Sequence, residues 1–174
     1  MPLWTEAIAF VFWFFYACFF EWVAHRHFMH APRYPLHDFF RGHMQHHRTY
    51  RGDHRFQVEA EGFVPGVTLR WYAFPGMLLG HMPFFALFEW LTGWPTFWGG
   101  VAACALYFAG YEYTHYLMHV PRGYFLERWS WFRFIRNHHH LHHRYMRCNY
   151  NVFIPLADAC LGTLRVGGIG SAKK

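Results

Sequence analysis

Three mostly apolar stretches divide the chain, and polar, histidine-rich stretches lie between and after them. The first runs from about Ala7 to Ala24, with Glu21 as its one inner charge. The second covers about Trp71 to Leu91, and the third covers about Pro95 to Tyr113. A helix of eighteen residues is roughly 27 Å long, which is close to the hydrocarbon thickness of a bilayer. The pattern therefore predicts three membrane-spanning helices.

The second and third stretches are joined by Thr92-Gly93-Trp94-Pro95, a strong turn signal. We expect them to form a helical hairpin whose second helix continues through His119. Pro75 and Pro83 interrupt the second stretch, so a bent or partly inserted helix stays open there. A soluble protein that buries the same helices in its core is the alternative.

The basic residues avoid the apolar parts of the chain. None of the sixteen Lys and Arg residues lies in 1–25 or 71–121, whereas six lie in 26–55 and nine in 122–174. By the positive-inside tendency, 26–70 and 120–174 are cytosolic, and the N-terminus and the hairpin tip lie outside. The net charge of +6 thus reflects membrane topology, and we expect no nucleic-acid partner.

We therefore predict a single all-α domain over residues 1–174, embedded in a bacterial inner membrane or the endoplasmic reticulum, with a helical cap on the cytosolic side. The N-terminus lacks a basic leader, carries Glu6 and has no convincing cleavage site, so we expect it to be retained.

Ten of the sixteen histidines form four short boxes on the predicted cytosolic side. They are His25 and His30; His43, His46 and His47; His115 and His119; and His139, His142 and His143. Helical positions three or four apart project from one face, so each box can aim its imidazoles at one point. A mononuclear zinc site needs only about four ligands. Ten imidazoles therefore predict two metal ions with about five ligands each. The box histidines fall into two sequence sets of five, one in residues 25–47 and one in residues 115–143.

The first box fits an α-helix poorly, because five residues turn through about 500° and leave His25 and His30 roughly 140° apart. A one-turn π-bulge would bring them into line, and binding from opposite flanks is the alternative. His27 with His30 is a rival pair on α-helical geometry alone.

The two halves of the chain also resemble each other. Residues 21–33 are similar to 112–122, and 46–51 are similar to 142–147, although chance matching around shared boxes is the alternative. The two halves can therefore surround a two-metal site with approximate two-fold symmetry. In the run His138 to His143, His138 and His140 are expected to be spectators, as in a local chelating tract.

The ligand set restricts the metal. Imidazole suits zinc, copper, iron and nickel, and a ligand set made of histidines alone disfavours copper(I), which prefers the sulfur of Cys or Met. Paired, nitrogen-rich sites with room for further ligands suit non-haem iron and dioxygen, and an apolar membrane setting implies an apolar substrate. Oxidising an unactivated C–H bond requires such a cofactor.

Two glutamates lie one helical turn from ligand positions: Glu21 four residues before His25, and Glu112 three before His115. A carboxylate that accepts the second N–H of a ligating imidazole orients it, so we assign that role to both glutamates. An interfacial glutamate that reaches water is the alternative, and Glu89 near the outer turn fits it better. For His81, within the second stretch, a hydrogen-bonded packing role is favoured over ligation.

With these motifs in place, residues 21–165 resemble the fatty acid hydroxylase/sterol desaturase superfamily of membrane di-iron oxygenases. The segments most similar to its fatty acid 2-hydroxylase branch are His25–His30, Gly42–His47, Tyr111–His119, His139–His143 and the closing segment Asn151–Thr163. Four boxes in this order, with a transmembrane hairpin between the second and third, form a specific signal.

The resemblance implies ten histidine ligands to two irons, with zinc as a substitute in purified protein, and O2-dependent hydroxylation or desaturation of a lipid. It also implies electrons from a separate cytochrome b5-like or ferredoxin-like carrier with its reductase. Relatives often have a further membrane helix before the first box, and some have a fused cytochrome b5 domain. Since this chain shows neither, we expect the carrier to be a partner protein and another subunit, in an oligomer, to complete the lipid-facing surface.

Two other functions are weighed against this one. A carotenoid ring hydroxylase has similar boxes, but its first two tend to lie closer than the twelve residues between His30 and His43. A membrane zinc-binding or transport protein would place ligands midway across its helices, where only His81 qualifies. Arg and Tyr residues near 48–55 and 122–147 are candidates for holding a polar head group.

Overall fold

The computed structural model describes residues 3–167, and every regular element within that range is a helix. The elements are α1 (Leu3–Ala24), η1 (His25–Met29), α2 (His37–Thr49), α3 (Ala73–Thr92), α4 (Phe97–His119), η2 (Phe125–Arg128), α5 (Ser130–Tyr145) and α6 (Leu156–Cys160). The predicted all-α fold is confirmed.

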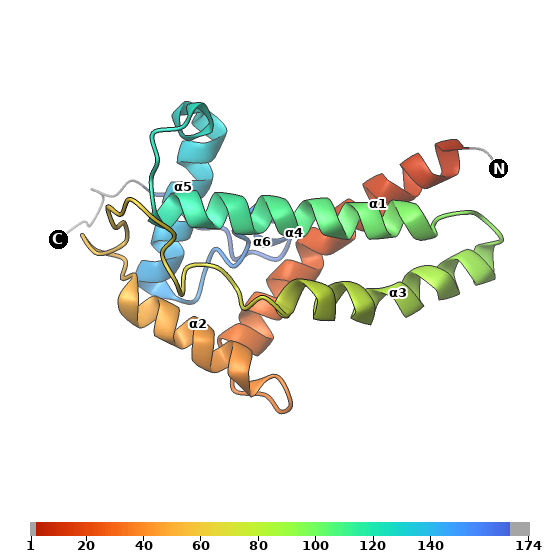
Figure 1. Cartoon of the computed structure of the whole chain (residues 1–174), viewed down its shortest axis with the longest axis horizontal. Helices are drawn as coiled ribbons and strands as arrows, with labels where there is room; N and C mark the ends of the chain where they lie inside the picture. Colours follow the sequence, from red (N-terminus) through yellow and green to blue (C-terminus); the bar gives the residue numbers. More distant parts are fainter. Residues whose placement is uncertain (1–2, 168–174) are drawn as a thin grey trace.

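Helices α1, α3 and α4 form an elongated body, in which α1 crosses α4 and α3 packs along α4 (Figure 1). The N-terminal end of α1 and the turn between α3 and α4 lie at one end of this body. Helices α2 and α5 gather at the opposite end, around the last turns of α1 and α4. The histidine boxes sit on the helices that meet there.

The predicted hairpin between α3 and α4 is present, and two local features build its turn. Gly93 ends α3 in the left-handed conformation (φ 67°), and its N–H donates to the Glu89 carbonyl at 2.9 Å. The Glu89 carboxylate accepts the N–H groups of Thr96 and Phe97 at 2.8 and 2.9 Å. Glu89 therefore caps the start of α4, in addition to lying at the turn as expected.

Helices α1 and α4 cross with their backbones almost touching. A Cβ added to Gly99 would lie 2.4 Å from the carbonyl oxygen of Glu6, so only glycine fits there. The Glu6 carboxylate also accepts the Gly99 N–H at 2.6 Å. Below this crossing, Trp13 and Phe85 pack edge to face with ring centroids 4.7 Å apart. The end of the helical body away from the histidine boxes is thus a tightly packed aromatic core.

One described helix, Leu3–Met29, is long and apolar enough to cross a membrane, with a mean hydropathy of 1.8. This segment includes the first predicted span. Helices α3 and α4 do not reach the same mean hydropathy. Their outer faces nevertheless carry large exposed apolar side chains, including Leu79, Trp90 and Trp98.

Candidate metal centre

A π-helical turn aligns the two histidines of the first box. Residues His25–Met29 form this turn, and the His30 N–H donates to the His25 carbonyl at 3.1 Å. The wider turn places positions five apart on one face, so the rings of His25 and His30 lie 5.1 Å apart between centroids. Of the two arrangements left open by the spacing, the π-bulge is the one observed. His27 instead packs beside Trp22 with its ring 5.9 Å away, outside both histidine groups.

The other three boxes come from α2, the last turn of α4, and α5. Their spacing of three or four residues puts each box on the inner face of its helix, and all eight imidazoles are buried. The structure brings all ten box histidines together at the end of the helical body.

The ten side chains form two groups, within each of which one nitrogen per ring lies within 4.8 Å of all the others. Group one is His25, His30, His43, His47 and His142, and group two is His46, His115, His119, His139 and His143. The five-and-five count matches the prediction. The groups are not the two sequence sets, however, because His46 and His142 are exchanged between the halves.

This exchange follows from the packing of α2 against α5. Consecutive residues on a helix point about 100° apart, so His46 and His47 face different groups, as do His142 and His143. The rings of His47 and His143 stack across the boundary with centroids 4.2 Å apart. The two groups therefore form one continuous centre.

In group one the Nε2 atoms face each other at short distances. Nε2 of His43 lies 2.9 Å from that of His25, 3.0 Å from that of His30 and 2.9 Å from that of His47. Two imidazole nitrogens about 2.1 Å from one metal are about 3.0 Å apart at a right angle and about 3.4 Å apart at a tetrahedral angle. The observed spacing favours more than four ligands around one ion.

Backbone carbonyls determine which ring nitrogen carries the proton. In group two, Nδ1–H of His46 donates to the Gly66 carbonyl at 3.1 Å, and Nδ1–H of His143 donates to the Tyr50 carbonyl. A neutral imidazole has a single N–H, so both Nε2 atoms present lone pairs. These two atoms lie 3.3 Å apart. Lone pairs repel at that distance unless a cation lies between them, so this donor set fits a metal ion.

The remaining members of group two agree with this assignment. Nδ1–H of His119 donates to the Phe56 carbonyl at 2.7 Å, and its Nε2 lies 3.2 Å from Nε2 of His139. Both ring nitrogens of His115 are buried and have no hydrogen-bond partner within residues 3–167. A buried imidazole without partners is costly, and a metal ion on one nitrogen removes part of that cost.

Burial also keeps the imidazoles neutral. Burial lowers the pKa of His46 to about 4 and that of His142 to about 3. It holds the pKa of His43, His139 and His143 well below the usual range, reinforced by neighbouring histidines. Metal ligation requires the neutral imidazole, so these ligands are ready at neutral pH.

The two glutamates expected to bind ligand imidazoles directly are bonded elsewhere. The Glu21 carboxylate accepts from the Tyr107 hydroxyl at 2.6 Å, and from the Val152 N–H and the Asn151 amide at 2.6 and 3.1 Å. The Glu112 carboxylate accepts the Leu69 N–H at 3.2 Å. Five of the ten imidazoles are held by backbone carbonyls of the loops instead.

An apolar cavity lies between α1, α3 and α4, beside group one. Its wall includes Phe20, Met77 and Phe108, together with the group-one histidine His25. Glu21 and Tyr107 also line it, but their polar atoms are bonded to each other. The cavity is therefore a mostly apolar space that borders one of the two histidine groups.

The other singled-out histidines lie outside both groups. Nδ1–H of His81 donates to the Met77 carbonyl at 2.7 Å, so the expected packing role is confirmed. His138 and His140 are also outside the groups, as expected of residues that do not bind the metal, and Nε2 of His138 lies 3.1 Å from a carboxylate oxygen of buried Asp158. Sequence reasoning missed Asp158, although a lone acidic residue in the apolar run Ile154–Leu161 was a signal.

Comparison of the chain with family models, with curated proteins and with solved structures finds no match in any of the three.

Proposed function

We propose that this chain is a membrane-bound oxidoreductase that uses O2 to hydroxylate or desaturate a fatty acyl chain or a related lipid. The observation that carries the proposal is the pairing of two five-histidine groups with an apolar cavity that has a histidine of one group, His25, in its wall. The first feature suits two metal ions, and the second suits a hydrocarbon substrate. The similarity of the histidine boxes to membrane di-iron oxygenases supports the same assignment.

Iron is the metal we assign to both groups, each with five histidine ligands. When bound, two irons supply the activation of dioxygen and the oxidation of a C–H bond, which side chains cannot perform. In hydroxylation, one oxygen atom enters the C–H bond, and the other leaves as water with two electrons and two protons taken up. Zinc can occupy the same ligands in purified protein without supporting this reaction.

The protein's own contribution is to orient ligands and to exclude water. Tyr150 and Cys148 hold the His25 and His142 rings by their carbonyls, while the loop before α3 holds three rings of group two. The apolar wall of the cavity binds the acyl chain and keeps bulk water away from the reacting carbon.

In the membrane we place α1, α3 and α4 as three spans, with the N-terminus outside and the metal centre at the cytosolic surface. The hydropathy of Leu3–Met29 and the exposed apolar faces of α3 and α4 support this arrangement. The distribution of basic residues sets its orientation.

The electron donor is a separate acidic carrier protein that docks beside group two. An open groove there is lined by Arg133, Arg136 and Arg144, which suits a partner of negative charge. Phe56 lies in the same groove, and its ring centroid is 4.6 Å from that of His119. Docking in this groove would bring a carrier within one aromatic ring of the metal centre.

The test is purified protein loaded with iron and supplied with lipid, O2 and a reductant, with lipid products measured by mass spectrometry. We expect an oxidised lipid from the intact protein and none from His142→Ala. His27→Ala is the matched control, because His27 lies between the group-one histidines His25 and His30 but outside both groups, and it should retain activity. Stoichiometric zinc with no turnover after iron loading would instead favour a zinc-binding or transport protein.

A further inference from the structure

Residues 148–165 contribute no ligand to either group, yet they hold two ligands of group one. Nδ1–H of His142 donates to the Cys148 carbonyl at 2.8 Å, and Nδ1–H of His25 donates to the Tyr150 carbonyl. In group two, the corresponding carbonyls belong to residues 50–66. Each metal group therefore depends on a different segment of backbone.

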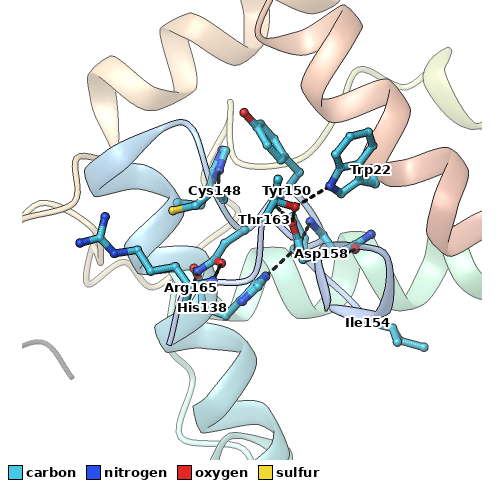
Figure 2. A network of polar contacts seen from close by, with 12 residues as sticks. Trp22, His138, Cys148, Tyr150, Ile154, Asp158, Thr163 and Arg165 are labelled. Carbon is cyan, nitrogen blue, oxygen red and sulfur yellow. Dashed lines mark hydrogen bonds and ion pairs between the residues drawn. The ribbon is translucent and has the colours of Figure 1, made fainter. Parts of the chain in front are cut away.

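A fully buried carboxylate, Asp158, organises the segment that serves group one (Figure 2). Its oxygens accept from the N–H groups of Tyr150 and Asn151 at 2.8 and 2.7 Å. They also accept from the Thr163 hydroxyl at 2.6 Å and from Nε2 of His138 at 3.1 Å. Four donors converge on one side chain, which restrains the segment from several directions.

The restraint reaches the ligands through short connections. Tyr150 is bonded to Asp158 by its N–H and to His25 by its carbonyl, so one residue separates the carboxylate from a ligand. Between Cys148 and Tyr150, Asn149 adopts a left-handed conformation (φ 57°). Its amide donates to the carbonyls of His138 and Arg165 at 3.0 Å each. The carbonyls of Cys148 and Tyr150 are thereby aimed at the two rings.

The same carboxylate ties together the two helices that carry these ligands. On α1, the Trp22 indole N–H donates to the Thr163 hydroxyl at 2.8 Å, three residues before His25. On α5, His138 lies four residues before His142 and contacts Asp158 directly. Figure 2 shows Trp22, Thr163, Asp158 and His138 in one continuous chain of contacts.

Asp158 accepts these hydrogen bonds as an ionised carboxylate. Burial raises the pKa of its carboxyl, but hydrogen bonds from His138, Thr163 and the backbone outweigh that effect. The pKa of Asp158 therefore lies below its ordinary value. The negative charge is compensated locally by four donors, as a buried charge must be.

We propose that Asp158 is a positioning residue for group one: by fixing the 148–152 backbone it sets the orientation of His25 and His142, and its loss releases one metal ion of the two. The inference rests on the metal-binding part of the proposed function and does not depend on the substrate. Group two should keep its ion, because its carbonyls come from another segment.

The test is Asp158→Asn, which keeps the size of the side chain and places N–H donors where acceptors are needed. We expect purified Asp158→Asn to hold one iron per chain where the unmodified protein holds two, with group-one affinity lowered by about 10–100-fold in chelator competition. Adding His115→Ala, in group two, should then leave no iron. Adding His43→Ala, in group one, should still leave one.

Glu127→Gln is the matched control for a purely structural effect. Glu127 is also a buried carboxylate, and it accepts two backbone N–H groups, from Arg122 and Tyr124, but it contacts no ligand. This variant should retain two irons. The proposal fails if Asp158→Asn binds two irons with unchanged affinity, or if it loses both irons or the one in group two.

If Asp158→Asn does not fold, Thr163→Val is used to test the proposal. This substitution removes one of the four donors to Asp158 at nearly constant side-chain volume. Group-one affinity should fall, and Thr163→Ser, which keeps the hydroxyl, should restore it; equal affinities in both variants would overturn the proposal. An unmodified protein that binds two irons but oxidises no lipid would defeat the proposed function and leave this inference standing.

Discussion

Replacing Gly52 by alanine should disturb group two and leave group one intact. A Cβ at Gly52 would lie 2.4 Å from the backbone N and Cα of Arg144 on α5. Non-bonded carbon atoms approach to about 3.5 Å, so the loop and the helix must separate by about 1 Å. The atoms in conflict belong to backbone, so no side-chain rotation relieves the contact.

The displaced loop carries the carbonyls of Tyr50 and Phe56, which hold His143 and His119. A 1 Å shift would stretch the 2.7 Å bond between the Phe56 carbonyl and His119 beyond hydrogen-bond range. We expect a loss of about 1–3 kcal/mol in folding stability from the forced contact. The group-two metal should bind about 10–100-fold more weakly, because its ligands lose their orienting partners.

The assay is iron content and chelator competition, with group identity read from double variants. Gly52→Ala combined with His43→Ala should hold almost no iron, whereas its combination with His115→Ala should still hold one. Gly42→Ala is the control: its Cβ meets nothing within 4 Å on α2, next to His43, and it should raise stability by about 0.5–1 kcal/mol. Unchanged affinity of both metals in Gly52→Ala, or equal loss of both, would refute the reasoning.

Three further outcomes are expected. Burial lowers the pKa of His46 from 6.5 to about 4, so between these pH values the unfolded chain binds a proton there that the folded chain does not. His46 alone should lower the stability of metal-free protein by about 3 kcal/mol as the pH drops from about 6.5 to 4, and the other buried histidines should add to that loss in chemical denaturation. Met77→Trp should fill the cavity and abolish lipid oxidation while both irons stay bound, and Leu79→Trp, whose side chain faces outward on the same helix, should do neither. Arg133→Glu should slow turnover with an acidic carrier about tenfold and weaken its salt dependence, but leave turnover with a small chemical reductant unchanged.

The spacing of the histidines predicted much of this centre. Spacings of three and four residues identified the histidines of α2, α4 and α5 that meet in the two groups, and the five-residue spacing of His25 and His30 left a π-turn as one of two arrangements. Periodicity along a single helix contains this information, because it depends only on residues close in sequence.

The exchange of His46 and His142 between the groups could not be predicted from the sequence. It depends on how α2 and α5 face each other, which adjacent residues on one helix cannot specify. The carbonyl partners of the histidine rings could not be predicted either. Every residue has a carbonyl, and only the path of the loop brings that of Tyr50 or Tyr150 to a ring. Glu21 and Glu112 illustrate the same limit: their spacing suggested direct contact with histidine, but the fold gave them other partners.

The most direct measurement is an anomalous difference map at the iron edge from crystals of iron-loaded protein. We expect two peaks, one among the Nε2 atoms of His25, His30, His43, His47 and His142, and one among the ring nitrogens of His46, His115, His119, His139 and His143. A single peak, or peaks coordinated by the sequence halves without exchange of His46 and His142, would contradict the two-metal centre described above.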